Sequence, residues 1–164
     1  MENVTVPVPQ DQPAESRGRA EATTRVCLLT LGGDVYAVDL RNVREVFEVD
    51  AITPVPGMPP ALVGVTNVRG AVVPVMDLRL VLGVSTAGPA LQYAVIIKHG
   101  NHQVGVLVER VPEIRTVHTE QFLPTPSSST GEAKPFLTAV LRLDDRMGGV
   151  VEVPTLLAYV ETGN

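Results

Sequence analysis

Four side chains are of the types that catalysis or metal binding uses most often: one cysteine and three histidines, at Cys27, His99, His102 and His118. His99 and His102 flank Gly100-Asn101, which is typical of a hairpin tip, and no neighbouring cysteine or carboxylate completes a metal site. His118 would act as a general base only with partners that the sequence does not locate, so a surface histidine is the better interpretation. We therefore predict that His99 and His102 lie in a solvated turn and that His118 lies on the surface.

Cys27 lies among Val26, Leu28 and Leu29, which predicts a buried, inert thiol on a strand. A single cysteine also excludes an internal disulfide and every multi-cysteine zinc site. Asp144-Asp145 and Gly32-Gly33-Asp34 indicate turns, because adjacent strand residues point oppositely and no Lys-Ser/Thr phosphate loop follows the glycines. We predict no active site and no cofactor or metal.

The elements that position these residues are mostly short strands, which favour a barrel or a sandwich. The predicted strands are Val26 to Leu31, Val35 to Val38, Leu62 to Val68, Val72 to Met76, Tyr93 to Lys98, Gln103 to Val108, Leu137 to Leu143 and Val150 to Val153. Helical periodicity is confined to three short segments. The best predicted helix is Asp39 to Phe47, and the others are Leu78 to Leu82 and Thr155 to Val160.

The segment from Pro56 to Gly83 is the most informative, because it predicts strand, tight turn, strand and short helix in succession. Gly70 can take a positive φ at the turn, and Arg69 beside it would project outward. Pro74 has no amide hydrogen, so its strand is expected to lie at a sheet edge or to contain a bulge near that point. Asp77 is placed to cap the helix that follows.

A weak internal repeat predicts two similar halves. The stretch from Val35 is echoed from Val104, and the stretch from Ala61 is echoed from Phe136. Duplication of this kind favours two small barrels that share a core. The second copy has Asp144-Asp145-Arg146 where the first has the Asn-Val-Arg-Gly turn.

Composition bounds the class of protein. The chain of 164 residues suits one domain or two intimately packed ones, with a net charge of −5 and 13 scattered Lys and Arg. Nucleic-acid binding is not expected, because no basic stripe is evident. The composition of residues 1–24 predicts a disordered tail, and that of residues 85–90 and 124–135 predicts surface loops. We expect no signal peptide, no membrane insertion and a cytoplasmic location.

The segment GVTNVRGAVVPVMDLR, from Gly64 to Arg79, resembles the CheW family of bacterial chemotaxis adaptors, whose pattern is GVxNLRGxxxPVxDLR. The resemblance extends to Leu31–Val46, Gln103–Val111 and Asp144–Leu157, and covers about 25–160. It implies an all-β fold with few short helices: two packed, five-stranded, SH3-like β-barrels. Residues 25–160 would form these two intertwined subdomains, between the tail at 1–24 and the C-terminal end at 161–164.

The resemblance also implies a function. A CheW-like adaptor is non-enzymatic and couples chemoreceptors to the histidine kinase CheA, and it is recruited from the cytoplasm to receptor arrays in which rings of CheW and CheA can form. It implies contact with the receptor's cytoplasmic tip at Val43, Arg69, Val72, Ala94 and Gly105. It implies contact with the regulatory domain of CheA at Leu40, Glu45, Val63 and Gly64.

Two alternatives stay open. One is a CheW-like paralogue in an array with another output, such as twitching motility. The other is a small β-barrel enzyme built on the three histidines and Cys27. Departures from the family pattern at Gly148-Gly149 and at Glu109-Arg110 predict a looser last strand and altered electrostatics at one rim. With no receiver domain or kinase core in the sequence, we expect a stand-alone adaptor.

Overall fold

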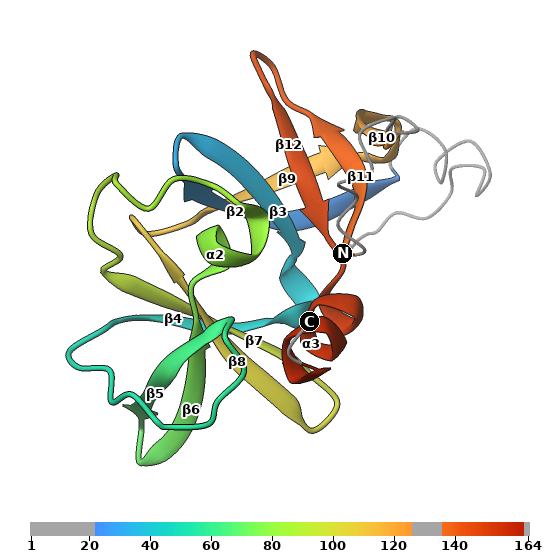
Figure 1. Cartoon of the computed structure of the whole chain (residues 1–164). Helices are drawn as coiled ribbons and strands as arrows, with labels where there is room; N and C mark the ends of the chain where they lie inside the picture. Colours follow the sequence, from blue (N-terminus) through green and yellow to red (C-terminus); the bar gives the residue numbers. More distant parts are fainter. Residues whose placement is uncertain (1–21, 126–135, 163–164) are drawn as a thin grey trace, which may run out of the picture.

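The computed structural model describes residues 22–125 and 136–162, which form two β-sheets with short helices at their junction (Figure 1). Most of the predicted tail (1–21), most of the second predicted loop (126–135) and residues 163–164 lie outside the described residues. The predicted tail is too long by two residues, because β2 begins at Thr23 and pairs there with His118. None of the described helices is both long and apolar enough to cross a membrane.

Within the described residues, one sheet has five strands and the other has six. The five-stranded sheet has the order β4 (Val43–Glu48), β7 (Tyr93–His99), β8 (His102–Val108), β6 (Ala71–Met76), β5 (Leu62–Val68). The six-stranded sheet has the order β10 (Phe122–Pro124), β11 (Leu137–Arg142), β12 (Met147–Val151), β3 (Asp34–Asp39), β2 (Thr23–Leu31), β9 (Glu113–His118). The mostly β architecture with few helices is as predicted, and the three-residue β10 is an addition to the expected five strands.

The two sheets are built on one plan. In each, a hairpin is followed by a helix: β5–β6 by α2 (Leu78–Leu82), and β11–β12 by α3 (Val153–Thr162). The second strand of each hairpin pairs in parallel with a strand of another hairpin, β6 with β8 and β12 with β3. The predicted repeat of strand, turn, strand and helix is therefore present in both halves.

The helix predicted from Asp39 to Phe47 is wrong. Only a single 3₁₀ turn, η1 (Leu40–Asn42), forms there, and the chain then continues as strand β4. Burial alternates along β4 as it does in a strand with one covered face, because β4 pairs with β7. The apolar residues of this short stretch fit both periods, and tertiary pairing selects the strand.

Two further strands, β9 and β10, were not predicted, and β12 is shifted. β9 has only two aliphatic residues, Ile114 and Val117, and they are three positions apart, so the strand lacks a period of two. The last strand ends at Val151, and Val153 begins α3 with Pro154 in its first turn, where a missing amide hydrogen is tolerated. Strand β6, with Pro74, lies inside its sheet, not at an edge.

Two pairings explain how Pro74 is tolerated in an interior strand. Pro74 lies opposite Val65, whose backbone N–H and C=O both bond to Thr53 on the other side, so this pair exchanges no hydrogen bond. The parallel ladder to β8 begins only at Val75, one residue later. The nearby bulge is in the partner strand β5, between Leu62 and Gly64, and not in β6, where it was expected.

The main hydrophobic core spans both sheets and both helices. Its fully buried members include Leu29 of β2, Ile97 of β7 and Leu156 of α3. Cys27 belongs to this core and is 1% exposed, and burial raises the pKa of its thiol to about 11. The prediction of a buried thiol on a strand is thus confirmed.

Glycines let the parallel strand pairs approach closely. Gly105 of β8 lies opposite Val75, and a Cβ on it would be 3.0 Å from Val75 Cγ1. Gly148 of β12 lies opposite Val35 of β3, and a Cβ there would be 3.0 Å from the Val35 carbonyl oxygen. Gly148 and Gly149 therefore fit a strand that is paired on both sides, with β11 and with β3.

The tripeptide Asp-Leu-Arg occurs twice and folds the same way each time. Asp39 and Asp77 each cap the following helical turn by accepting a hydrogen bond from the backbone N–H two residues on. In both copies the arginine also binds the same carboxylate through Nε and a terminal nitrogen, at 3.0 and 2.7 Å for Arg41 and at 3.0 and 2.9 Å for Arg79. The predicted cap at Asp77 is confirmed.

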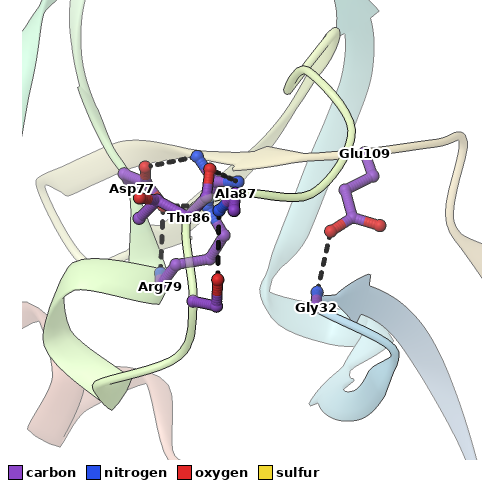
Figure 2. A network of polar contacts seen from close by, with 7 residues as sticks. Gly32, Asp77, Arg79, Thr86, Ala87 and Glu109 are labelled. Carbon is purple, nitrogen blue, oxygen red and sulfur yellow. Dashed lines mark hydrogen bonds and ion pairs between the residues drawn. The ribbon is translucent and has the colours of Figure 1, made fainter.

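The second copy is buried between strand β6 and the loop that follows α2 (Figure 2). The Asp77 carboxylate raises the pKa of Arg79, whose side chain also donates to the Thr86 carbonyl oxygen at 3.5 Å. Beside it, the Glu109 carboxylate, just after β8, accepts a 2.7 Å hydrogen bond from the N–H of Gly32 in the β2–β3 turn. The Gly32–Glu109 hydrogen bond holds the turn of one sheet against the end of a strand of the other.

Candidate functional site

The turn between β5 and β6 has an unusual backbone. Arg69 has φ 54° and Gly70 has φ 87°, so both central residues are left-handed, as in the tight turns that join hairpin strands. The N–H of Gly70 donates to Asn67 Oδ1 at 2.9 Å, which fixes the turn. Among the described residues Arg69 is the only non-glycine residue with a positive φ. An L-residue with a Cβ pays roughly 1–2 kcal/mol for this conformation.

The side chain of Arg69 reaches the far edge of its own sheet. Its Nε donates to Glu45 Oε1 of β4 at 2.9 Å, although β4 and β5 are the two outermost strands of the sheet. The Arg69 side chain is 80% exposed and that of Glu45 is 21% exposed. Its terminal N–H groups have no partner in the described part of the chain, so this end of the guanidinium faces solvent.

Apolar packing brings the same two edges together beneath the ion pair. Phe47 of β4 packs against a small buried cluster of Val68, Val73 and Ile96, which belong to β5, β6 and β7. The sheet is therefore curled until its outer strands meet, as in a barrel. The Glu45–Arg69 pair lies at the end of this closed sheet.

Val72 lies on the same hairpin and offers an apolar side chain beside the polar turn. It pairs with Asn67 and is 68% exposed, the largest exposed fraction of any large apolar residue in the described ranges. A mixed surface of arginine, carboxylate and an exposed aliphatic group is typical of protein interfaces. We call Glu45, Arg69 and Val72 the turn surface.

The other residues that the family resemblance assigns to receptor contact are covered. Val43 is half-buried and packs against the main core. Ala94 is 0% exposed, and Gly105 is buried beside Ala94, Val75 and Ile96. The structure thus places Ala94 and Gly105 inside the five-stranded sheet, where the space next to Gly105 is already filled by side chains.

The residues assigned to kinase contact are also mostly covered. Leu40 packs against the main core, and Val63 packs against a cluster that contains Ala94. Gly64 is buried, and a Cβ there would lie 2.5 Å from the Thr53 carbonyl oxygen. Of this set, only Glu45 has its side chain in a contact with the exposed turn.

The histidines and the cysteine are not assembled into one site. His99 and His102 face each other across the β7–β8 turn, and His102 Nδ1 lies 2.6 Å from Glu161 Oε2 of α3. His118 ends β9 in the other sheet, and Cys27 is buried in the core. Within the described ranges, no group of three or more His, Cys, Asp or Glu side chains is placed to hold a metal ion.

The direct contact between Glu45 and Arg69 is what the sequence did not predict. The two residues are 24 positions apart and stand on strands that do not pair. No local pattern reports such a contact. A strand prediction for 43–48 would have placed Glu45 at a sheet edge, but the curl of the sheet is a tertiary property.

Comparison with known proteins agrees with the fold and the turn sequence. The family model of the CheW-like domain matches residues 25–161 of this sequence. A probable chemotaxis protein CheW from Rhizobium etli is 33% identical over 133 residues, which cover 80% of this chain and 86% of that protein. The chemotaxis protein CheW of Klebsiella aerogenes is 31% identical over 139 residues, covering 82% and 81%.

Among solved structures, the scaffolding protein TtCheW from Thermoanaerobacter tengcongensis superposes with a TM-score of 0.70 at 25% identity. The match covers 78% of this chain and 88% of that one. The family match spans both sheets, both helices and the turn surface. The chain is therefore a member of the CheW family.

Proposed function

We propose that this protein is a non-enzymatic adaptor that couples chemoreceptors to the histidine kinase CheA in chemotaxis signalling. The observation that supports the proposal most strongly is the conformation of Arg69. Its left-handed backbone costs free energy, yet its guanidinium is exposed and only its Nε is used. Strain of this kind tends to be retained where a side chain must be presented to a partner.

The turn surface supplies the chemistry of a protein contact. The free fork of Arg69 can pair with a carboxylate or with the carbonyl groups at a helix end. Glu45 holds the guanidinium through Nε and so restricts the directions in which the fork can point. Val72 adds an aliphatic contact next to it. A receptor tip, which is a helical hairpin, would meet the arginine and the valine together.

Adaptor function requires that both partners be held at once, so that a change in the receptor alters the equilibrium of the kinase. Glu45 is the one residue of the kinase set whose side chain contacts the exposed turn, and it accepts a hydrogen bond directly from Arg69 of the receptor set. The proposed receptor and kinase contacts therefore meet at one ion pair. We propose that the protein acts at membrane receptor arrays, where weak contacts repeated in CheW–CheA rings accumulate avidity.

A co-sedimentation experiment tests the proposal. Receptor fragment, CheA and this protein are mixed, and the pelleted complex is compared for the wild type, Arg69→Glu and the control Arg146→Glu, which changes an arginine in the other hairpin turn. We expect the wild type and Arg146→Glu to assemble and Arg69→Glu to assemble at least about tenfold less well. If the wild type binds neither partner, the proposal fails.

A further inference from the structure

A second surface, separate from the turn surface, concentrates positive charge. A hollow of about 440 Å³ is lined by the cationic side chains Arg41, Arg44 and Lys98, with His99 at its rim. A neighbouring hollow of about 480 Å³ is lined by Arg25 and again by Arg41. Arg41 borders both hollows, and we call the four cations that line them the basic strip: Arg25, Arg41, Arg44 and Lys98.

The basic strip runs across the connection between the two sheets. Arg25 belongs to β2 of the six-stranded sheet, Arg41 to the 3₁₀ turn η1, Arg44 to β4 and Lys98 to β7 of the five-stranded sheet. The Arg41 side chain is 88% exposed, and Arg25, Arg44 and Lys98 are exposed. The strip is thus open to a partner along its whole length.

Its charge is opposite to that of the protein as a whole. The chain has a net charge of −5, yet the described residues that line the two hollows include four cations and a single carboxylate, Asp39. Asp39 is bonded to Arg41, whereas Arg25, Arg44 and Lys98 have no ion pair in the described part of the chain. Unneutralised charge gathered on an acidic protein attracts an anionic partner selectively and speeds its association.

The form of the strip favours a polypeptide. Three of its four cations are arginines, whose planar forks bind carboxylates through two parallel hydrogen bonds. The half-buried apolar residues Leu40 and Val43 line the hollows between the cations. Concave sites that mix arginine with aliphatic groups suit protein side chains, whereas anionic membranes attract clustered cations without requiring a hollow.

We propose that the basic strip binds a carboxylate-rich segment of a partner protein. The proposal extends the proposed function, since an adaptor has protein partners, but the four cations belong to neither the receptor set nor the kinase set, and the test uses neither receptor nor kinase. The test can therefore fail while the co-sedimentation experiment succeeds, and the reverse.

The probe is a synthetic peptide of Glu-Ala repeats, and binding is measured by amide chemical shifts of the folded full chain. Shifts are expected around η1, the start of β4 and the β7–β8 turn, and binding should weaken steeply between about 50 and about 300 mM ionic strength. The double variant Arg44→Glu/Lys98→Glu should bind at least about tenfold more weakly. The control Arg110→Glu/Arg142→Glu makes the same change in net charge at exposed positions elsewhere and should bind within about twofold of the wild type.

Three results would overturn the proposal. The first is that the wild type does not bind the peptide. The second is an equal loss in both double variants, which would mean that net charge and not the strip governs binding. The third is tighter binding to phosphatidylserine-containing vesicles than to the peptide, with the same residues shifted, which would assign the strip to a membrane. Chemical-shift spectra of each variant report directly whether it is folded.

Discussion

The guanidinium Nε of Arg69 lies 2.9 Å from Oε1 of Glu45. This contact ties the tip of one hairpin to the strand at the opposite edge of the same sheet. It also joins one residue of the proposed receptor contact to one residue of the proposed kinase contact. A disturbance at either residue is therefore expected to affect binding of both partners.

The left-handed turn predicts a conflict between stability and binding. Asparagine adopts a positive φ more readily than arginine and precedes glycine in the preferred hairpin turns. In Arg69→Asn, relief of strain should offset the lost exposed ion pair, which is worth at most about 1 kcal/mol. We expect a free energy of unfolding within about 0.5 kcal/mol of the wild type or higher, measured with urea, and impaired co-sedimentation. A loss of stability above about 1 kcal/mol would show that the pair is mainly structural.

The two Asp-Leu-Arg segments provide a matched comparison. In Asp77→Asn the Arg79 guanidinium stays buried without its carboxylate, which should lower the free energy of unfolding by about 3 kcal/mol. Asp39→Asn breaks the same geometry at a site where the arginine is exposed, and its effect should be much smaller. Urea denaturation of both variants gives the comparison. Equal losses would contradict the importance assigned to burial.

Asp39 also predicts a dependence on pH. Its hydrogen bond with the Arg41 side chain lowers the pKa of the carboxyl below its ordinary value. A lowered folded-state pKa means that this group stabilises the protein above its unfolded pKa of about 3.9, and that the contribution disappears as the pH falls through the folded-state value. The difference in unfolding free energy between wild type and Asp39→Asn should be constant from about pH 5 to 7 and shrink below about pH 4. A difference that grows on acidification would have the wrong sign.

Cys27 is expected to be unreactive in the folded protein. Burial raises the pKa of its thiol to about 11, so at pH 8 about one thiol in a thousand is ionised, and its exposed fraction is only 1%. A thiol reagent such as Ellman's reagent should label the unfolded protein rapidly and the native protein only at the rate of opening. Fast labelling under native conditions would contradict the position of Cys27 in the core.

Local chemistry explains which features the sequence could predict. Gly70 and Asp77 act on their nearest neighbours, and the turn and the cap occur where they were expected. The last helix was also predicted, although it begins at Val153, two residues before the predicted start at Thr155. The apolar pattern likewise located the hairpin strands β5 and β6, because each has enough residues to define a period.

The errors arose where long-range packing decides. Within the predicted helix, residues 43–47 form a strand because β7 pairs with them, and no local signal distinguishes that outcome from a helix. Ala94 and Gly105, whose contact with a receptor stays a prediction, are buried inside the sheet, which is also a tertiary property. The Glu45–Arg69 contact arises from the curl of the sheet, and so did not follow from the sequence.

A charge swap tests most directly whether Arg69 presents its guanidinium to a partner. Glu45→Arg, Arg69→Glu and the double variant are compared by co-sedimentation with receptor fragment and CheA, and their folding is checked by urea denaturation. The double variant restores an ion pair between the two positions but places a carboxylate at the turn tip. The account predicts that the double variant is folded and still fails to assemble; recovery of assembly in the double variant would show that the pair serves only to hold the fold.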